Sequence, residues 1–537
     1  MTADSAVRPR QETAPASVGE PDTPDADGIV IPPGRRPFVA MVVFLANFMV
    51  ILDTTIANVS VPHIAGDLGA TLAQGSWVIT SYAVAEAICV PLTGWLSQRF
   101  GLVRSFLVAL AGFSLFSLLC GLSVSLPMLV LCRIGQGLCG GPLMPLSQAL
   151  MPRIFPPAQL PKAYGLWTLT IMVGPAIGPI IGGVLSDQVS WHWIFLINVP
   201  IGFLCVTAGM TLLRPIETTP QKLPIDKGGL LLLVIWIGAL QLMLDTGREH
   251  DWFSSPMIVA LATVAGVAFC AFIIWELTER HPAVEIRLFG KWQFSVCVLV
   301  SALCYGAFFS GIVIVPQWLQ ATLGYSATDA GLITCLSTMT AMPASQIVMW
   351  LMLRVDTRLL VTIGCLLSAF SFYLRSFWST DIDFFHLALI FSFQGIGMPF
   401  LMMPLTQMAM STMTVEDTAS GAGLNNFLRT MSVAISTALV LSTWNNSAVT
   451  ARVAMAEQID PQQAAATLGT AGISGAVIPS YLSALVDRQA TTLAMLDTFL
   501  LAATAMLVSG AAIWVLPRIE MTRLKGTQAR RGAPDLH

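Results

Sequence analysis

The strongest constraint in this sequence is a series of fourteen mainly apolar stretches, each roughly 20 residues long. A helix of that length crosses the hydrocarbon core of a bilayer, which predicts an all-α polytopic membrane protein. Of the 537 residues, 55% are hydrophobic and only 11% are charged, which excludes a water-soluble globule. The expected spans are residues 37–58, 76–96, 105–123, 126–149, 163–185, 193–213, 225–245, 256–275, 293–315, 328–350, 357–376, 385–409, 420–442 and 493–516.

The distribution of positive charge predicts the orientation of these spans. If the amino terminus is cytoplasmic, most of the 27 Lys and Arg residues fall on the cytoplasmic side. Positive charge concentrates on that side of membrane proteins, so we expect both termini in the cytoplasm and an even number of spans. The Arg residues expected on the opposite side are Arg248, Arg375, Arg452 and Arg488, and those within spans are Arg133 and Arg429.

The segments between and before the spans carry less information. The first 36 residues are polar and lack the apolar core of a signal peptide, which predicts a disordered tail. A long polar insert at 445–492 is expected on the outer side, either as a helical hairpin or as a flexible loop, and its length favours a functional or partner-binding role. The ten cysteines are scattered without a CxxC pair, so neither a disulfide framework nor a metal site is expected.

The segment LDTTIANVSVP, residues 52–62, places a carboxylate inside the first span. An Asp at the centre of a spanning helix costs roughly 2.5–3.5 kcal/mol, so Asp53 either faces a wet cavity or caps and packs near the helix end. Arg133 lies about two turns inside the fourth span and cannot shed its charge, so it needs a partner. At 1.5 Å per residue both lie in the outer half of the membrane, which makes them candidate partners.

Glu86 is a second candidate proton carrier, near the middle of the second span. Burial favours the neutral form of a carboxylic acid, and a group that can be protonated inside the membrane suits proton transport. The alternative is a Glu that is hydrogen-bonded within a helix interface.

The segment GPAIGPIIGG, residues 174–183, combines a four-residue glycine period with two prolines. Its glycines form a smooth helix face that a neighbouring helix can approach closely, while the prolines kink the helix. Ordinary tight packing is the simpler interpretation. The residues of this motif are Gly174, Pro175, Gly178, Pro179, Gly182 and Gly183.

The segment GWLSQRFGLVR, residues 94–104, forms the turn between the second and third spans. A salt bridge here could hold the cytoplasmic ends of the helices together, and we call such a contact a latch. The residues of this motif are Gly94, Arg99, Gly101 and Arg104. Positive-inside anchoring explains the arginines equally well, but not the glycines.

Two segments in the second half of the chain contain candidate substrate contacts. The twelfth span contains Phe393 and Gln394 among many Met residues, and such adaptable side chains suit varied apolar ligands, although simple packing explains any single Met. NNFLRT, residues 425–430, contains Asn425 and Arg429, and Arg429 is a buried cation that either pairs structurally or contacts substrate.

These segments together resemble the fourteen-span drug:proton antiporters of the major facilitator superfamily, particularly the EmrB type. The resemblance covers residues 37–518. It is carried by LDTTIANVSVP, GWLSQRFG, the RxxxG of Arg133 to Gly137, GPAIGPIIGG, WHWIFLINVPIG at 191–202, GREHDWFSS at 247–255 and NNFLRT. One departure is Gln98, which stands where the family usually has the Asp of the latch.

The resemblance implies two six-helix bundles, at 37–214 and 281–518, separated by a linker and two inserted spans at 215–280. It implies cytoplasmic tails at 1–36 and 519–537, with the periplasmic insert 445–492 in the second bundle. It further implies alternating access by rocking of the bundles, a cavity lined by spans one and four, and assembly with a periplasmic adaptor and an outer-membrane channel.

The expected function is proton-driven export of hydrophobic or amphipathic compounds across a bacterial inner membrane, without a cofactor and without a nucleic-acid partner. The alternatives on the same fold are proton-coupled uptake, a dedicated fatty-acid or siderophore exporter, and a non-transporting sensor or scaffold. An enzyme is disfavoured because the six His residues are dispersed. ATP-driven transport is excluded because the sequence has no GxxxxGK[ST] loop.

Overall fold

A computed structural model describes residues 31–156, 159–325, 327–414, 417–460, 462–464, 468 and 477–517. All regular elements within these ranges are helices, as the hydropathy pattern predicts. The first group comprises α1 (Arg36–Asp67), α2 (Leu72–Cys89), η1 (Val90–Leu92), α3 (Thr93–Phe100), α4 (Leu102–Gly121), α5 (Leu126–Gly140), α6 (Leu143–Ile154), α7 (Leu160–Gln188), α8 (Trp193–Leu196), α9 (Asn198–Leu212) and η3 (Arg214–Ile216).

A pair of long helices follows, joined by two short turns: α10 (Lys227–Thr246), η4 (Gly247–His250), η5 (Trp252–Ser254) and α11 (Pro256–Thr278). The last group comprises η6 (Ile286–Gly290), α12 (Trp292–Leu323), α13 (Ala327–Leu351), α14 (Thr357–Arg375), α15 (Phe384–Met410), α16 (Thr418–Gln458), α18 (Ile478–Ala512) and η7 (Ile513–Val515).

Thirteen stretches of the described chain are long and apolar enough to cross a membrane. Each coincides with one of the predicted spans; for example, the second is the continuous stretch Trp77–Phe100 through α2, η1 and α3. The remaining predicted span, 163–185, falls within α7, a helix of 29 residues. The prediction of an all-α polytopic membrane protein is confirmed. Of the predicted tails 1–36 and 519–537, residues 1–30 and 519–537 lie outside the described residues.

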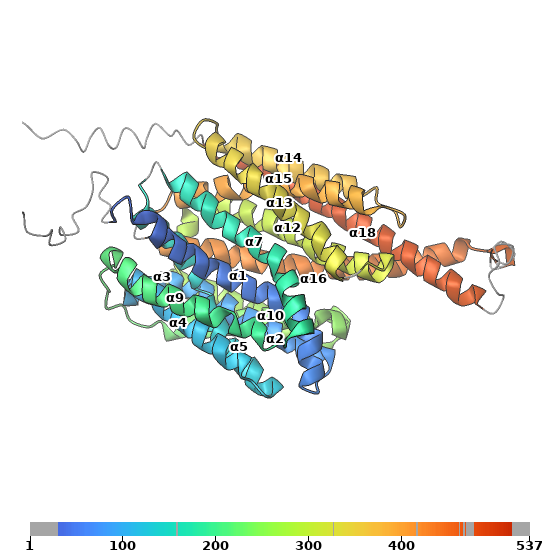
Figure 1. The fold of residues 1–537 in the computed structure, drawn as a ribbon, viewed down its shortest axis with the longest axis horizontal. Helices are drawn as coiled ribbons and strands as arrows, with labels where there is room; N and C mark the ends of the chain where they lie inside the picture. The colour runs from blue at the N-terminus through green and yellow to red at the C-terminus, as the bar shows by residue number, and fades with distance from the viewer. Residues whose placement is uncertain are drawn as a thin grey trace, which may run out of the picture.

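The long helices run side by side along the length of the molecule (Figure 1). In the first group α1 packs against α7 and α9, and α5 packs against α2 and α4. In the last group α12 packs against α16 and α18, while α15 packs against α13 and α14. The helices α10 and α11 pack against each other, and α10 also contacts both α2 and α16.

The two ends of this bundle differ. We call the end where α1 begins the near end and the opposite end the far end; α16 and α18 extend past the other helices at the far end (Figure 1). At the near end the first and last groups touch, because a Cβ atom on Gly94 of α3 would lie only 2.1 Å from Ser420 Oγ of α16. A side-chain hydrogen bond of 2.8 Å from Asn426 of α16 to Gln148 of α6 joins the same groups.

The glycine face of α7 packs against α1. Cβ atoms built on Gly174 and Gly178 would lie 2.4 Å from Ile51 Cγ2 and 2.1 Å from Thr55 Oγ1, respectively, and one on Gly182 would lie 3.1 Å from the carbonyl oxygen of Ile56. Only glycine permits this approach, as the four-residue spacing predicts. Gly183 is different, since nothing lies within 4 Å of its Cβ position. Pro175 and Pro179 lie in α7, but their side chains are outside the described part.

The contrast between neighbouring glycines gives a test of this packing. We expect Gly178→Val to force α1 and α7 apart and to lower the free energy of unfolding by about 2 kcal/mol, the usual cost of overpacking. Gly183→Val, which enters open space, serves as the matched control. Thermal unfolding of the purified protein in detergent measures both variants, and equal melting temperatures for the two would contradict the close approach.

Candidate functional site

Asp53 and Arg133 form a buried ion pair between α1 and α5. Arg133 Nη1 donates to Asp53 Oδ2 over 2.6 Å, and both side chains are at most 1% exposed. The predicted partnership of these two residues is therefore present in the structure. A desolvated pair of this kind is stable only when the remaining donors and acceptors are also satisfied.

Two amide side chains complete the pair. Asp53 Oδ1 accepts hydrogen bonds from Gln136 Nε2 at 2.9 Å and from Asn198 Nδ2 at 2.8 Å. Arg133 Nη1 also donates to Gln136 Oε1 at 2.9 Å, and its Nε donates to the carbonyl of Val78 on α2 at 3.1 Å. We name Asp53, Arg133, Gln136 and Asn198 the ion-pair cluster, which joins α1, α2, α5 and α9.

Sequence reasoning missed the two amides of this cluster. Gln136 lies one helical turn after Arg133, so its spacing could have indicated a shared face. Asn198 lies within WHWIFLINVPIG, where no spacing relates it to Asp53. The guanidinium of Arg133 additionally lies over the rings of Tyr82 at 4.7 Å and Phe195 at 5.0 Å, which stabilises its charge.

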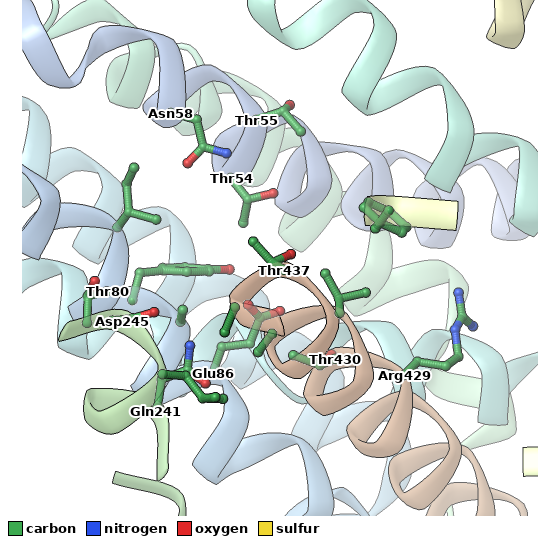
Figure 2. Close-up of a pocket in the computed structure, with 18 of the residues that line it drawn as sticks. Thr54, Thr55, Asn58, Thr80, Glu86, Gln241, Asp245, Arg429, Thr430 and Thr437 are labelled. Carbon is green, nitrogen blue, oxygen red and sulfur yellow. The ribbon is translucent and has the colours of Figure 1, made fainter. Parts of the chain in front are cut away.

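A cavity of about 560 Å³ lies beside the ion-pair cluster. It is lined by residues of α1, α2, α5, α6, α7, α10, η5, α12 and α16, so it is bounded by both groups and by the α10–α11 pair (Figure 2). Arg133 and Glu86 line it, whereas Asp53 does not. The cavity reaches from Asn426, at the near-end contact, to Trp252 in the far-end turn η5.

Glu86 differs from Asp53 in its surroundings. It lines the cavity, and no described side chain forms an ion pair or a hydrogen bond with it. Asp53 and Arg133 are nevertheless close enough to act on its charge. Of the two predicted proton carriers, Asp53 is thus fully bonded in the ion-pair cluster and Glu86 faces the cavity.

The predicted substrate residues in the second half of the chain lie in two separate places. Arg429 of α16 lines the cavity, with its guanidinium over the ring of Tyr305 at 3.6 Å and its Nε without a hydrogen-bond partner among the described residues. Asn425, one turn earlier, is buried away from the cavity lining, and its neighbour Asn426 lines the cavity instead.

Gln394 and Phe393 lie outside the cavity lining because α15 turns them toward α14. Phe393 packs edge-on against Phe370, and Gln394 accepts a hydrogen bond from Arg375. We therefore correct the expectation that these residues face the same cavity as Arg429.

Arg375, which was expected on the outer side at the end of the predicted span 357–376, does not face solvent. It ends α14 and is completely buried, with its guanidinium 4.0 Å from the ring centre of Phe391 and within 5.6 Å of three further rings, those of Phe372, Trp378 and Phe499. The faces of these rings stabilise the positive charge of the guanidinium, a role that an acidic side chain usually has.

The glycine-punctuated turn between α3 and α4 is held by the linker that follows α9. Glu217 accepts hydrogen bonds from the backbone N–H groups of Val103 at 3.0 Å and Arg104 at 2.9 Å, so it caps the first turn of α4. Arg99 donates to the carbonyl of Leu223 in the same linker. Gly101, at φ +94°, leaves room for the Glu217 carboxylate, because a Cβ atom there would lie 2.6 Å from Oε1.

Position 98 holds Gln instead of the usual Asp, and the carboxylate at this turn comes from Glu217 of the linker. Arg104 lies 3.8 Å from Glu217, but its side chain is 69% exposed, so this pair adds little. No group of three or more His, Cys, Asp or Glu side chains within the described ranges could hold a metal ion.

Comparison with known proteins identifies the family of this chain. The model of the Major Facilitator Superfamily matches residues 43–437. A chain with this match and these spans belongs to the Major Facilitator Superfamily, a family of membrane transporters.

The relatives place it further within that family. It is 40% identical to "Multidrug export protein EmrB" of Haemophilus influenzae over 90% of this chain and 96% of the relative, and 40% identical to the protein of the same name in Escherichia coli K12 over 88% and 93%. "Fatty acid resistance protein FarB" of Neisseria gonorrhoeae is 38% identical over 89% and 95%. The chain is a transporter of the EmrB type.

A solved structure supports the fold alone. The crystal structure of the human organic anion transporter MFSD10 (TETRAN) superimposes with a TM-score of 0.54 at 16% identity, covering 89% of this chain and 100% of that one.

The ion-pair cluster makes a prediction about stability. Asp53→Asn leaves the Arg133 guanidinium buried without an anion, and we expect it to lower the free energy of unfolding by about 3 kcal/mol. The double variant Asp53→Asn/Arg133→Gln removes both charges and should recover part of that loss. Thermal unfolding in detergent compares the three proteins, and a double variant less stable than the single one would argue against a compensated ion pair.

Proposed function

We propose that this protein exports hydrophobic or amphipathic compounds across a bacterial inner membrane in exchange for protons. The observation that carries the proposal is Glu86, a carboxylate without an ion-pair partner among the described side chains, on the wall of a cavity between the two groups of helices. Relatives named as multidrug export proteins over nine-tenths of the chain support export as the direction of transport.

The proposed proton site consists of Glu86 next to the ion-pair cluster. A proton that enters through the far end of the cavity binds the Glu86 carboxylate and neutralises it. Arg133 lines the same cavity and acts electrostatically on Glu86, so loss of that proton gives Arg133 a second anion besides Asp53. Competition between two carboxylates for one guanidinium links protonation to the packing of α1, α2 and α5.

Alternating access is the proposed conformational cycle. The near end is the cytoplasmic side in this proposal, and its contacts at Gly94–Ser420 and Gln148–Asn426 hold the two groups together. Opening toward the cytoplasm requires these contacts to separate while the far end closes. The glycine face between α1 and α7 lets the helices that bound the cavity move without losing close packing.

Transport in liposomes tests the proton site. With an imposed proton gradient, we expect the wild-type protein to move an amphipathic dye and Glu86→Gln to abolish gradient-driven movement, because the amide cannot exchange a proton. Asp53→Asn should also abolish it, because this variant removes the anion that competes with Glu86 for Arg133. Glu457→Gln, which changes an exposed acid of α16 far from the cavity, is the matched control and should retain full transport. Full coupled transport by Glu86→Gln would overturn the assignment of the proton site.

A dedicated exporter of fatty acids is the second candidate function. Arg429 is a buried cation in the cavity with no acidic partner among the described residues, and a substrate carboxylate would neutralise it. The relative named for fatty-acid resistance also supports a fatty acid as the substrate. Flux measured in inverted vesicles distinguishes either form of export from proton-coupled uptake.

We further propose that the far-end extension docks a periplasmic adaptor that leads to an outer-membrane channel. α16 has 41 residues, about 60 Å of helix at 1.5 Å per residue, and thus exceeds what a membrane span requires. Arg452 of α16 lies 2.8 Å from Asp487 of α18, so the two helices run together beyond the membrane. Exposed apolar side chains there include Val449, Val453, Val477 and Tyr481.

A truncation separates docking from transport. Because Arg452 and Asp487 are in contact, residues 453–486 can be replaced by a short Gly-Ser linker without separating the helices. We expect the truncated protein to transport dye in liposomes as well as the wild type does, but to lose co-purification of a periplasmic adaptor that is co-expressed with it. Normal adaptor yield with the truncated protein would contradict docking at the extension.

A further inference from the structure

The helix α10, which lies between the two main groups in sequence, contributes a polar corner to the cavity. Gln241 and Asp245, one turn apart, line it (Figure 2). α10 contacts α2 of the first group and α16 of the last group, so this corner touches both walls of the cavity. The mechanism proposed above uses neither residue.

Asp245 is an exposed carboxylate, and no Lys or Arg whose side chain is described forms an ion pair with it. Thr80 of α2 and Gln241 of α10 are its polar neighbours in the cavity wall (Figure 2). Gln241 is only 6% exposed, and its Oε1 has no hydrogen-bond partner in the described part of the chain. The corner therefore presents a negative charge and an unused acceptor oxygen.

An aromatic ring lies at the far end of the same cavity. Trp252 lines the cavity, and its ring lies against Gly247, where a Cβ atom would be 2.8 Å from the ring. Asp251 and Trp252 both have φ of +52°, a left-handed conformation that non-glycine residues rarely adopt. The turn between α10 and α11 thus holds the indole in a defined position, and the indole face attracts cations.

We propose that this corner, formed by Gln241, Asp245 and Trp252, binds the protonated amine of an amphipathic substrate. A protonated amine carries a positive charge for Asp245, an N–H donor for Gln241 Oε1 and a cation for the indole. Arg429 lies on the opposite side of the pocket from Asp245 and Gln241 (Figure 2), so the positive pole of the cavity is separate from this corner. The apolar part of the cavity takes the tail of the substrate.

This inference rests on the proposed export function, because it names a substrate class for the same cavity. It assigns recognition to the α10–α11 pair, which the proton site does not include. It also separates two chemistries at opposite sides of one cavity, with amines held at Asp245 and carboxylates at Arg429.

Equilibrium binding without a proton gradient tests the amine site. A radiolabelled long-chain primary amine and the fatty acid of equal chain length are titrated against the purified, full-length protein. We expect Asp245→Asn to weaken amine binding about tenfold, as loss of a charged hydrogen-bond partner does, and to leave fatty-acid binding within about twofold of wild type. Asp245→Glu should retain most amine binding, and Glu457→Gln, which changes an exposed acid of α16 outside the cavity lining, is the control.

Each outcome of this experiment is informative. Wild-type amine affinity in Asp245→Asn overturns the amine site, and so does an equal loss of amine and fatty-acid binding, which indicates structural damage. Trp252→Leu should weaken amine binding selectively, and unchanged binding would exclude the indole. Gradient-driven transport by the wild-type protein is measured in parallel, so that amine binding without transport contradicts the proposed export function and leaves the amine site standing.

Discussion

The ion pair between Asp53 and Arg133 is the interaction on which the cavity wall depends. Two charges inside a membrane protein are tolerated only when each is fully bonded, and Gln136, Asn198 and the carbonyl of Val78 supply the remaining bonds. These bonds join four helices at one point and fix the position of Arg133 on the cavity wall. The cluster thereby fixes the distance between the Arg133 charge and any nearby carboxylate that gains or loses a proton.

The charged groups of the interior differ in how completely they are compensated. Asp53 has partners for both oxygens, whereas Glu86 and Asp245 face the cavity without a bonded cation among the described side chains. Within the described part of the chain, Arg429 is supported by the ring of Tyr305, and Arg375 by an aromatic box together with Gln394. Uncompensated groups that line a cavity are available to protons and substrates, while those enclosed by aromatic rings are available to neither.

Much of the fold could be predicted from sequence, because hydropathy alone defines spanning helices. The pairing of Asp53 with Arg133 was predictable from their depth, and the glycine face of α7 from its period. The polar corner at Asp245 was not, because α10 reaches the cavity only through its packing between α2 and α16. The burial of Arg375 and its contact with Gln394 were not predictable, because the aromatic rings around Arg375 come from α14, α15 and α18, which are distant in sequence.

Proton release on substrate binding tests the central claim most directly. Exchange of substrate for protons through one cavity requires that the protein release the proton of Glu86 when substrate binds. A transported amphiphile without a titratable group is therefore added to the purified protein in weakly buffered detergent solution containing a pH indicator, across about pH 6 to 8. The account predicts a saturable release of protons that follows substrate occupancy, and binding without proton release at every pH would contradict it.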